Sequence, residues 1–333
     1  MSKARTLLGL VFLALGLWFL LAVFSSDEEP PAALQTFTSS AQCAECHAEV
    51  YDEWKASQHS ISWTNPRVQA LSNEFANQDC IDCHAPRPVF VTGIGERVLP
   101  RTARRPEGVD CISCHLLGDG HVAGTKTIPS AACSPVATLD LGRPDFCAGC
   151  HNQHKTVDQW RESDWPDRDQ DCFTCHMAFR DGDPNRGRSH VFPGGNDLAM
   201  LQRAVDLRAR RDGDGVAVEL ENVGAGHAFP TDERSRRADI FWRPASAPDR
   251  TPDGKTTWRH LYRIRDPYRT ETDMPSTLVH AGETLRVEIP EVPDEELVVA
   301  LFYMREPYFD DPALPDPEAK GAVLVHTVRV APR

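Results

Sequence analysis

The spacing of apolar and polar residues divides the chain into stretches of different character. An uninterrupted apolar run, Leu7–Phe24, is just long enough to cross a bilayer and predicts a transmembrane helix. Residues 25–40 are polar and contain prolines, so we expect a flexible tether there. From residue 41 to residue 196, proline, glycine and aspartate interrupt the pattern. This predicts a loop-rich region with short helices, the best at Ala48–Ser57 and Phe146–Ser163.

Residues 197–333 follow a different pattern. Apolar residues alternate with polar ones in several short runs, which is typical of strands in an antiparallel sheet. The predicted strands are Gly215–Leu220, Thr284–Ile289, Leu297–Tyr303 and Ala322–Val330. The expected fold class is therefore mixed: an N-terminal transmembrane helix over residues 1–24, a mainly α, loop-rich domain over 41–196, and an all-β, sandwich-like domain over 197–333.

The N-terminal apolar run predicts the compartment of the chain. Lys3 and Arg5 precede it and acidic residues follow it, so the positive-inside rule places the N-terminus in the cytoplasm. The nearest small-residue cleavage option, at Val23–Ser25, matches a signal-peptidase site poorly, so we prefer an uncleaved anchor to a cleaved signal peptide. Under either alternative the rest of the chain is exported to the periplasmic side of a bacterial inner membrane.

Net charge and composition narrow the function. The formal charge is −13, and acidic residues outnumber basic ones in both halves of the chain, which argues against nucleic acid as a partner. The chain has 11 cysteines and 13 histidines. Cysteine is too scarce for a disulfide-dense scaffold, so the spacing of these residues is more informative than their number.

Ten of the 11 cysteines fall into repeats of the pattern C-x-x-C-H. This pattern is the attachment signature of c-type haem. The two thiols add to the vinyl groups of the haem as thioethers, and the adjacent histidine lies beneath the iron as its proximal ligand. The motifs are Cys43/Cys46/His47, Cys80/Cys83/His84, Cys111/Cys114/His115, Cys147/Cys150/His151 and Cys172/Cys175/His176.

Other uses of paired cysteines fit this pattern less well. A thioredoxin-like dithiol needs a βαβ context, which the pattern lacks. Zinc sites join two C-x-x-C units, and an odd number of units cannot pair evenly. The sequence therefore predicts five covalently bound haem c groups, attached outside the cytoplasm. The remaining cysteine, Cys133, is given no role.

Each iron then needs a sixth ligand or an open position. A histidine close to its own motif, such as His154 after His151, cannot reach the opposite face of that haem and would have to serve a neighbouring one. His260, His280 and His326 lie in strand-like runs and are interpreted as structural. The distal candidates are His59, His121, His154, His190 and His227.

The cysteine motifs belong to an internal repeat. CAECH leads to the element W-x-x-S-x-H, which ends at His59, and CAGCH leads to QWRESDW, where Trp165 replaces the histidine. Each half of the repeat continues into a second motif, QDCIDCH and QDCFTCH. The segments RSHVFPGG and GAGHAFPT, which contain His190 and His227, follow.

With these motifs, residues 41–235 resemble the multihaem cytochromes c related to the cytochrome c-554-type electron acceptor of hydroxylamine oxidoreductase. The resemblance implies that the motif histidines are proximal ligands and that His59, His190 and His227 are distal ligands. It also implies a strand-rich domain after GAGHAFPT. The chain departs from the tetrahaem pattern by its fifth motif and by Trp165, so the identity of the partner does not carry over.

The resulting hypothesis is a membrane-anchored periplasmic cytochrome that relays electrons in respiration between redox partners. Bis-His ligation would make it a low-potential carrier, and we expect it to be non-catalytic. One alternative is a multihaem reductase or oxidase of small nitrogen or sulfur compounds with one open haem site; the C-x-x-C-K motif typical of pentahaem nitrite reductases is absent. Another is the subunit of a haem filament, an oligomer in which a distal histidine comes from the next chain.

Overall fold

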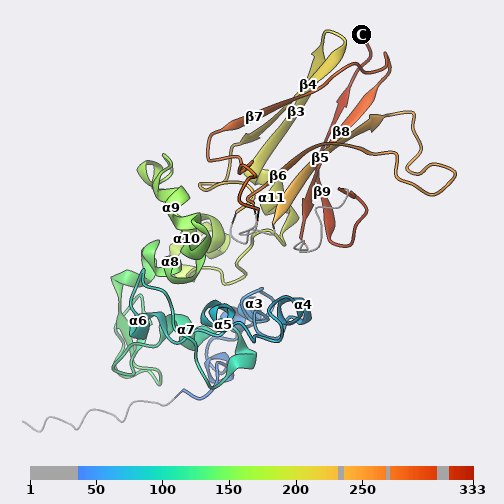
Figure 1. The fold of residues 1–333 in the computed structure, drawn as a ribbon. Coiled ribbons are helices and arrows are strands. Elements are labelled where there is room, and N and C mark those ends of the chain that lie inside the picture. Colours follow the sequence, from blue (N-terminus) through green and yellow to red (C-terminus); the bar gives the residue numbers. More distant parts are fainter. Residues whose placement is uncertain (1–36, 232–235, 268–270, 306–314) are drawn as a thin grey trace, which may run out of the picture.

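The computed structural model describes residues 37–231, 236–267, 271–305 and 315–333 (Figure 1). Within these residues, no helix is both long and apolar enough to cross a membrane. The predicted transmembrane helix and most of the predicted tether lie outside the described residues. The described chain is a helical part followed by a strand-rich part, which is the mixed class that the sequence predicts.

The helical part consists of short helices joined by turns. Its α-helices are α2 (Ala41–Ala44), α3 (Ala48–Lys55), α4 (Pro66–Leu71), α5 (Gln78–His84), α6 (Val89–Thr92), α7 (Cys111–His115), α8 (Asp145–His151), α9 (Thr156–Arg161) and α10 (Cys172–His176). Its 3-10 helices are η1 (Arg105–Glu107), η2 (Leu139–Gly142), η3 (Asn152–His154), η4 (Pro166–Arg168), η5 (Arg180–Gly182) and η6 (Pro184–Arg186). A parallel pair, β1 (Val122–Gly124) and β2 (Pro135–Ala137), lies between α7 and η2.

Side-chain caps start three of the helices that carry a cysteine motif. The Asp110 carboxylate accepts a hydrogen bond from the Ser113 backbone N–H at 2.8 Å before α7. The Asp171 carboxylate accepts one from the Thr174 N–H at 2.8 Å before α10, and Asn77 caps α5 in the same way. Such caps satisfy donors that a first helical turn leaves unpaired. Each of these helices, like α8, ends on its motif histidine, so a single short helix positions both thiols and the imidazole.

The strand-rich part begins with α11 (Leu198–Ala204) and continues as two antiparallel sheets. One sheet has the order β3–β4–β7, made from β3 (Val205–Asp212), β4 (Gly215–Asn222) and β7 (Thr284–Ile289). The other has the order β6–β5–β8–β9, made from β6 (Arg259–Arg265), β5 (Arg237–Pro244), β8 (Leu297–Met304) and β9 (Ala322–Val330). Side chains of both sheets, among them Val218, Leu220, Ile240 and Leu301, share one buried apolar core, so the two sheets form a sandwich.

All four predicted strands are present, as β4, β7, β8 and β9. Strands β3, β5 and β6 were not predicted. The predicted helix Ala48–Ser57 is present as α3, whereas the predicted helix Phe146–Ser163 is wrong as a single element. It breaks at Lys155, whose φ of 73° is left-handed, so that α8 and α9 are separate helices.

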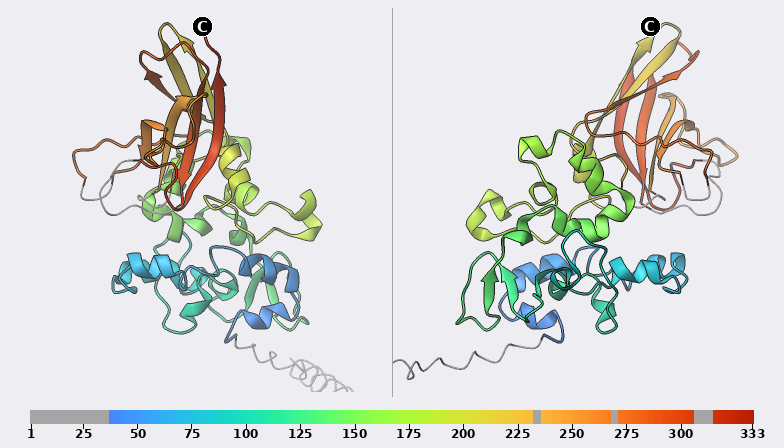
Figure 2. Two further views of the ribbon diagram at one scale, coloured as in Figure 1. Left: turned by 90° about the vertical axis from the view of Figure 1, so that its right-hand side faces the viewer. Right: turned by 60° about the vertical axis from the view of Figure 1, so that its left-hand side comes forward.

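The two views in Figure 2 show the sandwich standing at one end of the helical part. Helices α8, α9 and α10 are the α-helices of that part nearest to the sandwich, and α3 to α7 lie on its far side (Figure 1). The fourth and fifth cysteine motifs, on α8 and α10, are therefore the ones closest to the strand-rich part.

Candidate haem-binding cavity

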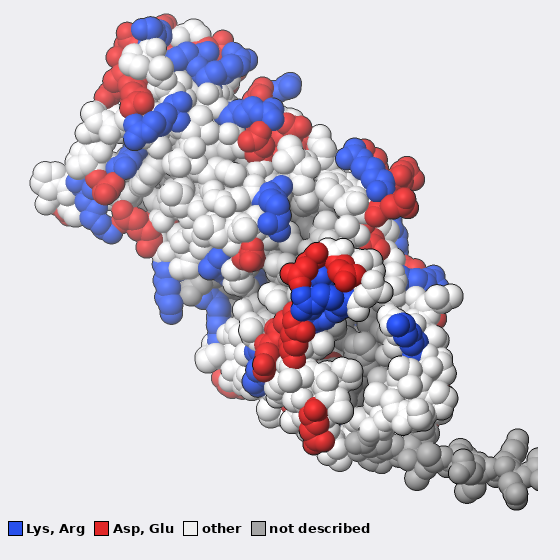
Figure 3. All heavy atoms as spheres, turned by 180° about the vertical axis from the view of Figure 1, so that it is seen from behind, with Lys and Arg blue, Asp and Glu red and all other residues white. Residues whose placement is uncertain are grey.

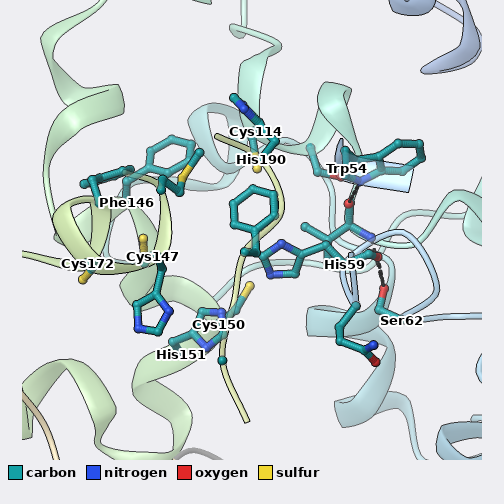
Figure 4. Close-up of a pocket in the computed structure, with 18 of the residues that line it drawn as sticks. Trp54, His59, Ser62, Cys114, Phe146, Cys147, Cys150, His151, Cys172 and His190 are labelled. Atoms are coloured by element: carbon teal, nitrogen blue, oxygen red, sulfur yellow. Dashed lines mark hydrogen bonds between the residues drawn. The ribbon is translucent and has the colours of Figure 1, made fainter. Parts of the chain in front are cut away.

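A large cavity extends through the helical part and reaches the sandwich. Its volume is about 2680 Å³, several times the ~300–1000 Å³ of a pocket for one small ligand. Every cysteine and histidine of the C-x-x-C-H motifs lines it. Figure 4 shows part of it, with Cys147, Cys150 and His151 near His59 across the same space.

The cysteines are available for covalent attachment. None of the 11 is in a disulfide. Thiols of different motifs lie close enough to alter one another's pKa: Cys111 raises the pKa of Cys43, Cys83 raises that of Cys150, and Cys172 raises that of Cys147. Cofactors attached to these motifs would therefore be close neighbours.

Backbone carbonyl groups fix the orientation of three motif histidines. In each case the Nδ1 atom lies within hydrogen-bond distance of a carbonyl oxygen, which can only accept, so Nδ1 carries the proton. The pairs are His84 with Ser62 (2.8 Å), His115 with Ala123 (2.8 Å) and His176 with Pro193 (2.6 Å). The second nitrogen, Nε2, is then the unprotonated one, which is the usual arrangement of a metal-ligating histidine.

Three motif histidines face a histidine from a distant segment. The ring centroids of His151 and His59 are 6.2 Å apart, those of His115 and His190 are 6.3 Å apart, and those of His176 and His227 are 6.3 Å apart. The last two pairs are close to parallel, with angles of 29° and 14° between the ring planes. All six rings line the cavity.

This spacing fits an iron between the two rings of each pair. Metal–imidazole bonds of about 2.0 Å on both sides, plus the distance from each bound nitrogen to its ring centre, give centroids about 6 Å apart. Free thiols, oriented histidines and the volume of the cavity fit the same group. The residues are therefore suited to hold haem c.

Burial lowers the pKa of several of these histidines. Desolvation is the main cause for His115 and His176, whose pKa values lie below the ordinary value. Desolvation, helped by the neighbouring His115, lowers the pKa of His190 to about 4. The neutral ring, which is the form that binds a metal, is thus present at neutral pH.

The carbonyl group of His59 holds this residue in place. It accepts hydrogen bonds from the Val109 N–H and the Ser62 hydroxyl, both at 2.9 Å. Gly108, with a φ of 63°, lies so close that a Cβ there would be 2.3 Å from the same oxygen. The ring lies edge-on to Phe192, with 4.4 Å between centroids.

A buried arginine supports this region. Arg101 is 6% exposed and donates hydrogen bonds to the Asp110 carboxylate (3.2 Å), the Ser113 hydroxyl (2.8 Å) and the Gly108 carbonyl (2.6 Å). It therefore ties the start of α7 to the turn that holds His59. The sequence analysis missed this role, since nothing in the spacing of Arg101 distinguishes it from a surface arginine.

Glu53 of α3 positions the segment that carries His190. Its carboxylate accepts the His190 backbone N–H at 2.7 Å and two hydrogen bonds from Arg180, at 2.9 and 2.6 Å. Burial raises the pKa of Glu53, but these hydrogen bonds and the Arg180 charge outweigh it and lower the pKa overall. His190 also directs its Nδ1 to the Arg188 carbonyl at 3.0 Å.

The sandwich supplies His227 from the loop that follows β4. Asn222, 1% exposed, donates to the His227 carbonyl at 2.8 Å. Gln159 of α9 accepts the Ala228 N–H at 3.2 Å, which joins this loop to the helical part. Gly226 lies against Trp160 and Trp165, and a Cβ there would be 3.0 Å from an atom of each ring. Neither Asn222 nor Gln159 was singled out in the sequence.

The other histidines lie in different settings. His154 lines the cavity, as do His47 and His84. His121 does not line it; its side chain is 36% exposed and lies 3.2 Å from Asp119. The structure thus does not bring His121 to the predicted site. The three histidines interpreted as structural also lie outside the cavity lining.

Comparisons with known proteins find similar cytochromes c. The family model of cytochrome c554 and c-prime matches residues 42–116. No curated protein matches the chain. A solved penta-heme cytochrome c552 from Thermochromatium tepidum superposes with a TM-score of 0.60 at 19% identity, covering 87% of this chain and 98% of that one.

Superoxide reductases superpose on a smaller part. That of Nanoarchaeum equitans has a TM-score of 0.20 at 11% identity, over 39% of this chain and 93% of its own. That of Archaeoglobus fulgidus has a TM-score of 0.21 at 7% identity, over 39% and 90%. These scores are too low to carry an argument. The family match covers the first three C-x-x-C-H motifs. Together with the motif-lined cavity, it shows that the chain is similar to multihaem cytochromes c, and the lining is suited to covalently bound haem c.

Proposed function

We propose that the chain is a pentahaem c-type cytochrome that relays electrons between redox partners through a series of bis-His haems. The observation that carries this proposal is the set of three facing histidine pairs, His59–His151, His190–His115 and His227–His176, at 6.2 to 6.3 Å. Each pair joins a motif histidine to a segment distant in sequence. Cross-ligation of this kind would fix neighbouring haems relative to one another.

Contacts between motifs support an order for the haems. Cys111 raises the pKa of the Cys43 thiol, which supports a position of the first motif beside the third. The fourth motif lies close to both the second and the fifth, since Cys83 raises the pKa of Cys150 and Cys172 raises that of Cys147. Cys114 of the third motif also raises the pKa of both cysteines of the fourth. We infer the order first–third–fourth–fifth, with the second as a branch at the fourth.

Haem iron supplies one-electron chemistry when bound. The chain's own contribution is to hold each pair of imidazoles in one orientation, to keep them neutral by burial, and to exclude water. Buried apolar residues such as Phe146 and Phe173 pack among the cysteines of the second to fourth motifs. Two imidazole ligands on an iron favour a lower reduction potential than a methionine ligand, so we propose a low-potential carrier.

We extend the proposal to the first two motifs. His154 lines the same cavity as His47 and His84 and is our candidate for a sixth ligand to one of their irons. His121 was predicted for the same role, but its place outside the cavity lining makes it the weaker candidate.

Location and partners complete the proposal. The apolar run Leu7–Phe24 and the extracytoplasmic attachment of haem c support a membrane-anchored protein on the periplasmic side. The similarity of residues 42–116 to cytochrome c554 and c-prime supports redox partners. On the face shown in Figure 3, acidic and basic side chains are interspersed. The net charge of −13 favours a basic docking patch on a partner.

The test is to count haems and to probe each iron with carbon monoxide. We expect five haems per chain and no spectral change when carbon monoxide is added to the reduced protein. The variants His59→Ala, His190→Ala and His227→Ala should each create one carbon monoxide-binding haem, whereas His280→Ala, at an exposed position, should create none.

Two outcomes would contradict the proposal. Four or fewer haems would remove the pentahaem assignment. Carbon monoxide binding by the unaltered protein would show an open iron, and the reductase or oxidase alternative would then be tested with nitrite, hydroxylamine and tetrathionate.

A further inference from the structure

The cavity wall is more basic than the chain as a whole. Lysine and arginine number 36 in the chain against 49 aspartates and glutamates. Among the residues that line the cavity this balance is reversed. The acidic ones are Glu45, Asp110 and Asp171, and the basic ones are Arg67, Lys126, Arg188, Arg236, Arg305 and Lys320.

Three of these basic residues come from one end of one sheet. Arg236 directly precedes β5, Arg305 directly follows β8, and Lys320 comes shortly before β9. The three strands are neighbours, and their register pairs Met304 with both Arg237 and Ala322. The topology therefore gathers three cations at the end of the sheet that faces the cavity.

This end of the sheet lies beside the fifth cysteine motif. The Arg305 Nε donates to the Gly195 carbonyl at 3.3 Å. Gly195 comes two residues after Pro193, whose carbonyl accepts the Nδ1 proton of His176 at 2.6 Å. Tyr303 packs so closely that a Cβ at Gly195 would be 2.7 Å from its hydroxyl oxygen.

Among the described residues, little acidic charge balances the two arginines. Arg236 and Arg305 are partly buried, and Arg236 donates to the Arg305 backbone carbonyl. In the part of the chain that the structure describes, no carboxylate lies within ion-pair distance of either guanidinium. A partly buried cation is costly without a counter-charge, so the wall is suited to receive anionic groups. Guanidinium groups bind carboxylates through paired N–H donors.

We propose that Arg236 and Arg305 bind the propionate carboxylates of the haem c held by the fifth motif, with Lys320 at the rim. The proposal rests on the proposed function, since it needs a haem on Cys172 and Cys175. A nearby positive charge favours the reduced form of an iron, because reduction adds an electron. These cations would therefore raise the reduction potential of the fifth haem above the value it would have without them.

The test needs a way to recognise the fifth haem among several. His227→Met replaces its proposed distal imidazole by a thioether, which raises the potential and separates its redox step from the rest. On this background, Arg305→Gln should lower the separated potential by about 59 mV, a tenfold change in the equilibrium constant of a one-electron couple. Arg305→Lys keeps the charge and should restore most of the shift. Arg286→Gln, on β7 and 77% exposed, is the matched control and should cause none.

The measurement is a spectroelectrochemical titration, with haem per chain counted in the same samples. If His227→Met does not assemble, Arg305→Gln and Arg305→Lys are compared in the unaltered background through the sum of all midpoint potentials. A full haem count with an unchanged potential in Arg305→Gln would overturn the proposal and leave the proposed function standing. A haem missing from the fifth motif in the unaltered protein would overturn the proposed function itself. A potential that shifts in Arg305→Gln and is not restored in Arg305→Lys would indicate a structural effect of the substitution. That result would overturn the proposal that Arg305 binds a propionate.

Discussion

The two parts of the molecule build their interiors differently. The sandwich has one apolar core of 22 buried residues drawn from both sheets, α11 and the segments that join them. The helical part has two small clusters, with four and three buried apolar residues. Where a protein of this size would have a core, the helical part has a cavity of about 2680 Å³ lined by cysteines and histidines.

This difference shows what specifies each fold. The sandwich buries enough apolar surface to offset the entropy of ordering its chain. The helical part, with α-helices of four to eight residues, cannot do so, because isolated helices shorter than about 12 residues are marginal in water. Under the proposed function, covalently attached haem would supply the missing stability, as a metal or disulfides do in small domains.

The largest expected effect follows from withholding haem. Produced in the cytoplasm without haem attachment, the chain should fold only in its sandwich. Hydrogen exchange followed by mass spectrometry should show protection in β3 to β9 and almost none in α2 to α10. The haem-loaded protein, as control, should protect both parts.

Protection of α7, α8 and α10 in the haem-free chain would contradict this expectation. It would mean that caps such as Asp110 and Asp171, together with the Arg101 hydrogen bonds, suffice to fold the helical part.

The same comparison explains what could be predicted from the sequence. Alternating strands such as β4 and β7 were found because the residues on one face of each are more buried than those on the other. Strand β5 was missed because it is buried on both faces: Ile240 faces the main core while Phe241 packs on Phe302 beneath Trp258, so no alternation appears. The short helices are set by caps and by left-handed residues such as Lys155, which periodicity does not detect.

The candidate site also has a part that the sequence predicts and a part that it does not. The covalent motifs are local in sequence, so their residues could be named at once. Which histidines face one another depends on the tertiary fold: His59 and His151 are 92 positions apart (151 − 59), with 6.2 Å between ring centroids. His121 was placed on proximity to its motif alone, and its assignment as a distal ligand remains a prediction. Positioning residues such as Glu53 and Asn222 carry no sequence signal, because their role depends on which carbonyl or N–H they meet.

A substitution in the core of the sandwich tests whether this part is stabilised by its apolar core, and we expect an effect of intermediate size. Leu220 of β4 is fully buried, and Leu220→Ala should lower the free energy of unfolding of the sandwich by about 2–5 kcal/mol through lost burial and a cavity. The measurement is hydrogen exchange of the β4 peptides in the haem-loaded protein. Leu324→Ala on β9, 44% exposed, is the matched control and should cost less than about 1 kcal/mol. An equal effect of the two variants would argue against a self-sufficient core.

The smallest expected effect concerns a buried charge on the outer face of the sandwich. Asp239 of β5 is 1% exposed and faces three basic side chains: His260 Nε2 at 3.0 Å, Arg263 Nε at 2.7 Å and Arg237 Nε at 3.6 Å. Burial raises the pKa of Asp239, but the hydrogen bonds from His260 and Arg263 and the Arg263 charge outweigh it and lower the pKa overall.

A carboxylate whose pKa is lower in the folded state stabilises the fold above its unfolded pKa, about 3.9, and loses that contribution as the pH falls through the folded value. Asp239→Asn should therefore cost about 1–3 kcal/mol at pH 7, and the cost should shrink below about pH 4. The cost at each pH is measured by denaturant-dependent hydrogen exchange of the β5 peptides at pH 7 and pH 3. The exchange is corrected for intrinsic rates. Asp249→Asn, at an 85% exposed position paired with Arg243, should change little at either pH. A cost that stayed constant across this range would show that Asp239 acts by packing rather than by charge, and that even the outer face of the sandwich depends on apolar contacts.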